Sequence, residues 1–153
     1  MNIDLKLVNY KPFAGHDGGM GYNVDLKFNG KKVAHAHDDA WGGGVMYTTI
    51  DKEGFDSLLL AIKEKRDEDY SPQVLLEFEI CDMLKALDMK KDEKKGILCK
   101  HFNGWKIYGW NLSLPKMLER YGIESIQEYY NELKSEGKEV INGEYLKSIG
   151  VNL

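Results

Sequence analysis

An Asn-Gly pair between two runs of alternating residues constrains the fold of this chain more than any other feature. In residues 22–28 every second side chain is apolar, and residues 31–38 follow directly after Asn29-Gly30. A tight two-residue turn needs left-handed backbone at both positions, which asparagine and glycine adopt most readily. The sequence therefore predicts an antiparallel hairpin of residues 22–28 and 31–38.

The remaining periodicity predicts the other elements of the fold. Alternating apolar residues predict further strands at residues 3–7 and 45–50, so the first third of the chain is expected to form an antiparallel meander. Apolar residues at helical spacing predict a helix after Asp51 and another from Ser71-Pro72. A second hairpin, residues 97–102 and 105–110, is expected to turn at Asn103-Gly104.

The C-terminal third is expected to be helical. Ser113 and Asn142 are placed to begin helices, and Ser125 with Glu128 forms a capping-box pattern for a third helix. No Pro/Ser-rich linker separates these pieces. We therefore expect one α+β domain over residues 1–153, with an N-terminal antiparallel β-meander, two central helices, a second β-hairpin and a helical C-terminus.

Extending the register of the first hairpin away from its turn suggests a candidate site. The register pairs Val24 with His35 and Tyr22 with His37, so both histidines are expected on the apolar face. It also brings the loop of residues 15–21 beside the loop of residues 38–44, at the open end of the hairpin.

The histidines and aspartates of these two loops and of the strand between them allow two interpretations, and both stay open. Imidazoles and carboxylates suit a divalent metal, which would make the chain a metal-dependent hydrolase of a phosphate-bearing or nucleotide substrate. The ligands would come from His16, Asp17, His35, His37 and Asp39. In the other interpretation His35 is a hydrogen-bonded core histidine, the aspartates shape glycine-rich turns, and the chain has no cofactor.

Aromatic residues indicate where a partner protein would bind. Tryptophan and tyrosine dominate the energetics of protein interfaces. In-register pairing of the second hairpin puts Phe102 and Trp105 on one face and Tyr108 and Trp110 on the other, and the alternative is that helices cover both faces. The predicted partner-binding residues are Tyr22, Trp41, Gly42, Gly43, Gly44, Trp105, Tyr108 and Trp110.

Charge and targeting features exclude several classes of protein. The 25 acidic and 21 basic residues give a net charge of −4, so we do not expect direct nucleic-acid binding. No apolar run is long enough to span a membrane, and the N-terminus lacks the pattern of a signal peptide. We expect a cytoplasmic protein, with Cys81 and Cys99 both reduced.

Several short stretches resemble small accessory proteins encoded by bacteriophages, prophages and plasmids. The resemblance is carried by Gly18-Gly19-Met20-Gly21-Tyr22, by Phe28 to Ala34, by Asp38-Asp39 ahead of Gly42-Gly43-Gly44, and by Gly137 to Asn142 before Tyr145-Leu146. It implies no catalytic residues. The resemblance does imply a biological role as an accessory factor, because such genes often encode inhibitors of bacterial defence systems, such as anti-CRISPR proteins. We therefore expect a non-enzymatic module that binds a host protein complex in the bacterial host cytoplasm. The sequence leaves its oligomeric state open.

Overall fold

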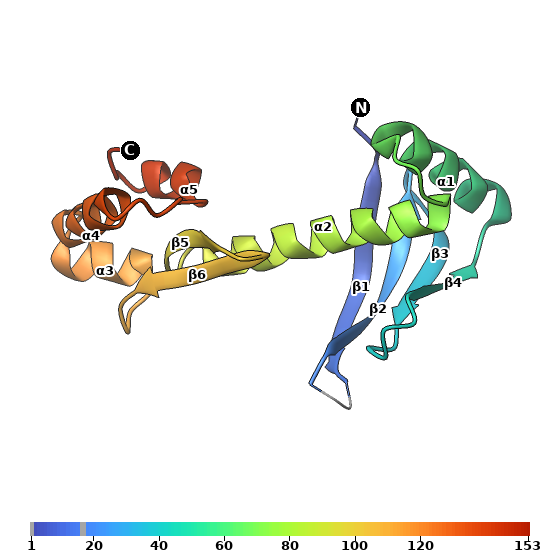
Figure 1. Cartoon of the computed structure of the whole chain (residues 1–153), viewed down its shortest axis with the longest axis horizontal. Coiled ribbons are helices and arrows are strands. Elements are labelled where there is room, and N and C mark those ends of the chain that lie inside the picture. The colour runs from blue at the N-terminus through green and yellow to red at the C-terminus, as the bar shows by residue number, and fades with distance from the viewer. Residues whose placement is uncertain (1, 16–17) are drawn as a thin grey trace. The chain divides into compact units, whose positions relative to one another are not determined.

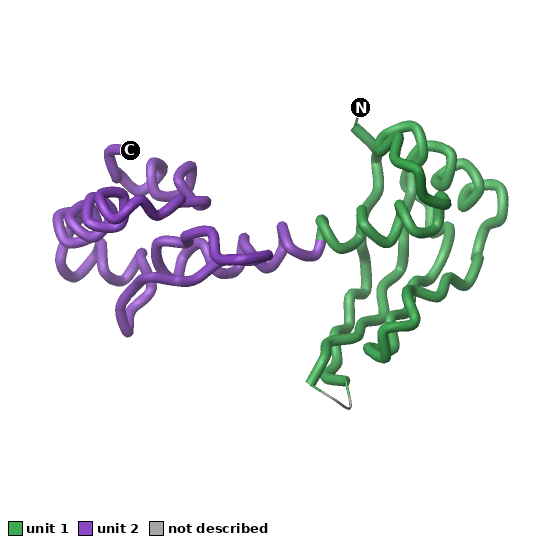
Figure 2. The backbone as a smooth tube through the Cα atoms, viewed as in Figure 1, with its two compact units in different colours: residues 1–83 green, residues 84–153 purple. Residues whose placement is uncertain are grey.

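The computed structural model describes residues 2–15 and 18–153, and it has the α+β fold that the sequence predicts (Figure 1). The chain divides into two compact units, Met1–Met83 and Leu84–Leu153 (Figure 2). Helix α2 contributes its residues up to Met83 to the first unit and the rest to the second. The expectation of a single domain stays a prediction.

The first unit is a four-stranded antiparallel meander with helices on one face (Figure 1). Its strands follow one another in sequence order, which is the arrangement that short hairpin connections produce. Its elements are β1 (Leu5–Ala14), β2 (Met20–Phe28), β3 (Lys31–Asp38), β4 (Val45–Thr49), α1 (Lys52–Arg66) and the start of α2 (Pro72–Asp92).

Apolar side chains of β2 and β3 form the core of this unit together with those of the two helices. Leu26, Leu58 and Ile80 are fully buried and come from β2, α1 and α2 respectively. Burying an aliphatic side chain of this size stabilises a fold by roughly 2 kcal/mol. The other face of the sheet carries mostly polar residues, as expected when only one face of an antiparallel sheet is covered.

A buried carboxylate joins the two helices of this unit. Glu79 on α2 is nearly buried and forms ion pairs with Lys65 and Arg66 at the end of α1. Arg66 also pairs with Asp82, one turn further along α2. Because a buried carboxylate needs such partners, these contacts fix how the end of α1 meets α2.

The register of the first hairpin corrects the sequence-based expectation. From the turn, Phe28 pairs with Lys31 as predicted, but Leu26 pairs with Ala34 rather than Val33. Val33 is an extra residue in β3, a β-bulge, and its carbonyl accepts hydrogen bonds from the N–H groups of Ile50 and Asp51. Beyond the bulge every residue of β3 is shifted by one position.

This shift moves the two histidines to the opposite face of the sheet. His35 pairs with Asp25 and His37 with Asn23, so both lie on the polar face and not on the apolar one. A slip of one residue exchanges the two faces of a strand, because side chains alternate with a period of two. The expectation that the histidines share the apolar face is wrong for this reason.

The second unit packs the β5–β6 hairpin against three helices. Apolar residues from every one of these elements join one buried cluster, which includes Ile97, Leu114, Ile126 and Leu146. Its elements are the end of α2, β5 (Gly96–His101), β6 (Gly104–Gly109), α3 (Leu114–Tyr121), α4 (Glu124–Ser135) and α5 (Gly143–Ser148).

Asn142 is the polar centre of this unit. Its side chain is 4% exposed, and its oxygen accepts the backbone N–H of Leu98 at 3.0 Å. Its amide nitrogen donates to the carbonyls of Glu93 and Gly96, at 3.1 and 2.9 Å. The sequence predicts Asn142 as a helix cap, and it does occupy that position before α5. Its side chain makes no cap hydrogen bond, and instead joins three backbone groups of a distant segment.

Two local predictions in this unit are wrong. The second hairpin turns at Phe102-Asn103, because His101 pairs with Gly104 and Lys100 with Trp105. Phe102 therefore lies in the turn, with a φ of 50°, and not on a strand face. Helix α4 begins at Glu124, so Ser125 lies inside the helix and does not cap it. Among the described residues, no helix is long and apolar enough to cross a membrane.

Candidate functional site

The two glycine-rich loops of the first unit meet at one end of the sheet, which confirms their predicted proximity. A methyl group added to Gly15 would lie 2.6 Å from Cβ of Ala40. A methyl group added to Gly21 would overlap the carbonyl oxygen of Asp38 and lie 2.5 Å from the Phe13 ring. Glycine at these positions therefore allows the backbones of the two loops to approach closely.

Two aspartates shape the loop between β3 and β4. Oδ1 of Asp38 accepts the backbone N–H of Ala40 at 2.8 Å, and Oδ1 of Asp39 accepts that of Trp41 at 2.9 Å. These are Asx turns, in which a short side chain replaces a backbone acceptor and fixes the loop. Ala40 and Gly42 both have positive φ, of 67° and 81°. The loop thus holds the Trp41 backbone in a defined conformation, while the Trp41 side chain is 67% exposed.

Exposed apolar side chains gather along β4 and its flanks. Trp41, Met46 and Ile50 are 67%, 57% and 55% exposed. They account for three of the six exposed large hydrophobic residues that the structure describes in residues 1–83. We call residues 41–50 the β4 edge, because β4 is the last strand of the sheet and β3 is its one strand neighbour among the described residues. Clustered exposed apolar residues are typical of an interaction surface.

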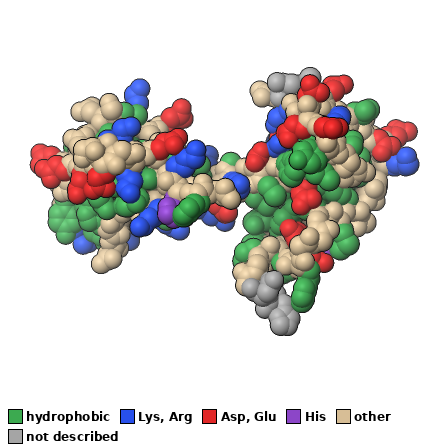
Figure 3. Space-filling view, viewed as in Figure 1, with side chains coloured by type: hydrophobic (Ala, Val, Ile, Leu, Met, Phe, Trp, Pro, Cys, Tyr) green, Lys and Arg blue, Asp and Glu red, His purple; other side chains and the backbone are tan. Residues whose placement is uncertain are grey.

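Acidic residues flank the β4 edge at both ends. Residues 38–56 contain five acidic side chains and a single basic one, Lys52, whereas β4 itself carries no charge. Asp38 and Asp39 precede the edge, and Asp51 and Glu53 follow it. Figure 3 shows hydrophobic and acidic side chains together on the visible face of this unit. Asp51 forms an ion pair with Lys31, and Lys52 pairs with Asp56, so Glu53 is the acidic side chain at that end to which these two lysines are not paired. The β4 edge is therefore an uncharged strand with acidic residues beyond both ends.

The other predicted contact residues of this unit differ in exposure. Tyr22 is buried in the core and offers little surface; its hydroxyl has no hydrogen-bond partner among the described residues, and burial raises the pKa of this hydroxyl. Gly42 and Gly43 are exposed, and Gly44 is half-buried. A side chain added to Gly44 would face Glu77 on α2 at 3.7 Å.

A polar network occupies the open face of the sheet. His35 Nδ1 donates to Oδ1 of Asp25 at 2.8 Å, and its Nε2 lies 3.2 Å from Oδ1 of Asn23. His37 Nδ1 lies 2.9 Å from the same Asn23 oxygen. A hydrogen bond from Asn9, with others from His35 and Lys32, lowers the pKa of Asp25 to about 2.

The polar network of the open face contains two of the predicted metal ligands. The described residues contain no group of three or more His, Cys, Asp and Glu side chains that could hold a metal ion. Of the predicted ligands, His35 and His37 join the network and Asp39 forms the turn at Trp41. His16 and Asp17 lie outside the described residues, so the hypothesis stays a prediction.

The predicted aromatic contact residues of the second unit are half-buried. The rings of Tyr108 and Trp110 meet Tyr129 edge-on, with centroids 6.4 and 5.3 Å apart. Nε1 of Trp105 donates to Asp92 at the end of α2, at 3.0 Å. Tyr108 and Trp110 therefore pack partly within the unit, whereas Ile107, which precedes Tyr108, is exposed, and the contact role of these aromatic residues stays a prediction.

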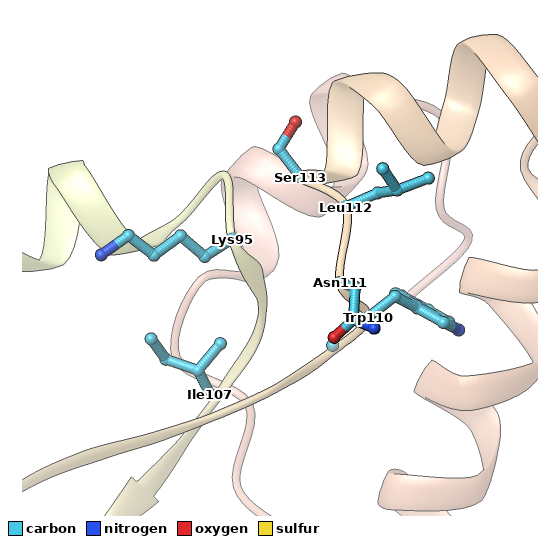
Figure 4. Close-up of a pocket in the computed structure, with 7 residues that line it drawn as sticks. Lys95, Ile107, Trp110, Asn111, Leu112 and Ser113 are labelled. Atoms are coloured by element: carbon cyan, nitrogen blue, oxygen red, sulfur yellow. The ribbon is translucent and has the colours of Figure 1, made fainter.

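Shallow hollows surround the segment that joins β6 to α3. One has a volume of about 400 Å³, with Lys95 and Ile107 on one side and residues 110–113 on the other (Figure 4). A second, of about 540 Å³, lies between Trp110, Arg120 and Tyr121. Lys95, which lines the first hollow, forms an ion pair with Asp92 through its Nζ.

The sequence names Trp41 as a contact residue, which stays a prediction, and does not name Met46, Ile50 or the polar network. The position of Met46 on the open face follows from the alternation of β4 once the pairing with β3 is known. Met46 pairs with His37, and Thr48 pairs with His35. Asp25 and Asn23 could have been found only with the correct register.

No family model, curated protein or solved structure matches the chain.

Proposed function

We propose that this chain is a non-enzymatic protein-binding module, with the β4 edge and its preceding loop as the contact surface. The observation that carries the proposal is the exposure of Trp41 on a loop whose backbone is fixed by Asx turns. A large aromatic side chain left in water gains most from burial against a partner. A loop that is already ordered loses little conformational entropy on binding, so more of that gain appears as affinity.

Met46 and Ile50 extend this surface along the strand. Hot-spot residues are typically surrounded by contacts that exclude water. Met46 lies on β4, the strand that follows the Trp41 loop, and Ile50 comes directly after that strand. The resemblance to phage and plasmid accessory proteins supports a biological setting for this surface. In that setting the partner is a host defence complex, and the module inhibits it in the manner of an anti-CRISPR protein.

Site-specific photo-crosslinking tests the contact surface. A benzophenone amino acid replaces Trp41 in one full-length variant and Tyr121, an exposed aromatic residue of the second unit, in a control variant. Both are expressed in a bacterial host that carries a defence system. We expect crosslinks to a host protein from position 41 and few from position 121. Equal crosslinking from both positions, or none from position 41, would refute the proposed surface.

Binding of the purified chain to the crosslinked protein gives the quantitative test. Trp41→Ala is expected to weaken the complex at least about tenfold, which is typical of a hot-spot tryptophan. Tyr121→Ala serves as the matched control, with circular dichroism to show that both variants fold. In cells, wild-type protein is expected to raise phage plaquing on the defended host, and Trp41→Ala to lose that effect. A Trp41→Ala protein as active as the wild type would contradict the proposal.

A further inference from the structure

We infer that the β4 edge binds a basic, extended segment of a partner protein, which adds to the sheet as a fifth strand. The inference rests on the proposed function and specifies how the partner is held. In this binding mode backbone hydrogen bonds supply affinity, and alternate side chains of the added strand supply specificity.

The backbone of β4 has hydrogen-bonding groups available for such a strand. In an antiparallel pair, alternate residues direct their N–H and C=O groups toward the neighbouring strand and away from it. Ile50 donates its N–H to Val33 of β3, so by alternation Thr48 and Met46 also face β3. Val45, Tyr47 and Thr49 then direct their backbone groups outward, and Thr49 is exposed.

The two edges of the sheet differ in their protection against strand addition. Edge strands are commonly blocked by lysine, proline or a bulge. The outer strand β1 has all three, because it carries Lys6, Lys11 and Pro12, and its register breaks between Val8 and Lys11. Asn9 lies in that bulge with a φ of 54°.

Strand β4 has none of these protective features. Its residues, Val-Met-Tyr-Thr-Thr, include no charged residue and no proline, and its pairing with β3 is regular along its whole length. Valine, tyrosine and threonine are also residues that favour extended structure. Strand addition is therefore directed to β4 and away from β1.

Side chains on the open face define what the added strand would contact. Met46 and Thr48 are exposed on this face, whereas Tyr47 points to the helix side, where its hydroxyl donates to the Gln73 carbonyl. Cross-strand neighbours on one face lie about 5 Å apart. An apolar residue of the incoming strand would thus pack beside Met46, and a residue near the end of that strand would meet Trp41.

Charge selects a basic partner and disfavours a second copy of this chain. Residues 1–83 contain 15 acidic and nine basic side chains, a net charge of −6. In an antiparallel β4–β4 pair, Asp38 and Asp39 of one copy would approach Glu53 of the other, next to Asp51, which pairs with Lys31 of its own chain. Like charges across an interface oppose association, whereas lysine or arginine at the ends of the added strand would be attracted.

The experiment uses the full-length chain and two synthetic peptides, an octapeptide of alternating lysine and valine and its counterpart of alternating glutamate and valine. At low ionic strength we expect the lysine peptide to bind at least about tenfold more tightly than the glutamate peptide. Amide hydrogen exchange should slow at Val45, Tyr47 and Thr49 and stay unchanged in β1. Equal affinity for both peptides, or protection of β1 instead, would overturn the inference.

Substitutions at Thr49 separate backbone pairing from side-chain contact. Thr49→Pro removes an outward N–H, and proline is tolerated at edge positions whose N–H faces solvent. It should weaken binding of the lysine peptide about tenfold or more, whereas Thr49→Val, which keeps the N–H, should bind like the wild type. Unchanged binding by a folded Thr49→Pro protein would refute strand addition.

A charge variant keeps the inference testable if Thr49→Pro does not fold. Asp39→Asn with Glu53→Gln removes two charges at the ends of the β4 edge, and asparagine preserves the acceptor for the Trp41 N–H. The control, Asp67→Asn with Asp69→Asn, removes the same charge elsewhere in the unit. Only the first pair should weaken binding, by about tenfold at low ionic strength, and equal effects of both pairs would refute a role for the flanking charges.

Failure of this inference is distinguishable from failure of the proposed function. If Trp41→Ala abolishes binding of the crosslinked host protein but Thr49→Pro does not, the surface is right and strand addition is wrong. If β4 amides become protected with rising protein concentration and sedimentation shows a dimer, a second copy occupies the edge and the basic partner is refuted.

Discussion

Replacing Asn142 should destabilise the second unit more than any surface substitution. Its amide joins Leu98 to the carbonyls of Glu93 and Gly96 through three hydrogen bonds. In Asn142→Ala the buried N–H of Leu98 loses its acceptor, at a cost of about 1–3 kcal/mol, and each carbonyl loses a donor worth about 1 kcal/mol. The expected loss is therefore about 4 kcal/mol, a large fraction of the stability of an ordinary domain.

Asn142→Asp tests the polarity of the same site. An ionised carboxylate still accepts from Leu98 but repels the carbonyls of Glu93 and Gly96, which favours the protonated form in the folded state. The pKa of this Asp should therefore rise above its unfolded value. The variant is then most stable below the unfolded pKa and loses stability as the pH rises through the folded pKa.

Denaturant unfolding followed by tryptophan fluorescence measures these effects. In a Trp41→Phe background the signal comes from Trp105 and Trp110, both in the second unit. Asn131→Ala is the control, because Asn131 is exposed on α4 and should change stability by less than about 0.5 kcal/mol. A loss below about 1 kcal/mol for Asn142→Ala would refute the reasoning, since an unpaired buried N–H cannot cost so little.

Three other substitutions have expected effects on the stability of the chain. Gly21→Ala should lower stability by about 2 kcal/mol in a thermal melt, because its methyl group would overlap the Asp38 carbonyl. Gly43→Ala has no neighbour within 4 Å and should be nearly neutral, and equal effects of the two substitutions would contradict this reasoning. The pKa of Asp25 is lowered to about 2, so its ionised form contributes about 2 kcal/mol to the free energy of unfolding above pH 4, and this contribution is lost as the pH falls toward 2. Asp25→Asn should remove this pH dependence from unfolding curves. Phe102 is 87% exposed with a positive φ, so Phe102→Gly should be neutral or stabilising by up to about 1 kcal/mol, and a clear loss of stability would show that the ring packs in solution.

Most elements of the fold could be predicted from local sequence. The Asn29-Gly30 turn, the helix beginning at Pro72 and the helix ending before Gly122 all follow from residues within a few positions of the boundary. Turn and cap preferences depend on the backbone conformation of one or two residues, which the residue type itself restricts. The meander and the proximity of the two glycine-rich loops then follow from short connections.

The candidate site could be predicted only in part. Trp41 was named from the sequence because it lies beside three glycines in an expected loop, and the structure leaves it 67% exposed. The faces of His35 and His37 were not predictable, because one bulge at Val33 inverts them. The bulge places the Val33 carbonyl against the N–H groups of Ile50 and Asp51, which are distant in sequence, so no local pattern encodes it.

The sequence by itself determined which segments are strands and helices, and where the chain turns. Tertiary structure decided the register and what each polar side chain bonds to. Asn142 shows the difference: its sequence context predicts a helix cap, yet its amide bonds to backbone groups that are 44 to 49 residues away. Local preferences are worth about 1 kcal/mol each, and satisfying a buried backbone group is worth as much or more, so long-range pairing overrides the local choice wherever the two compete.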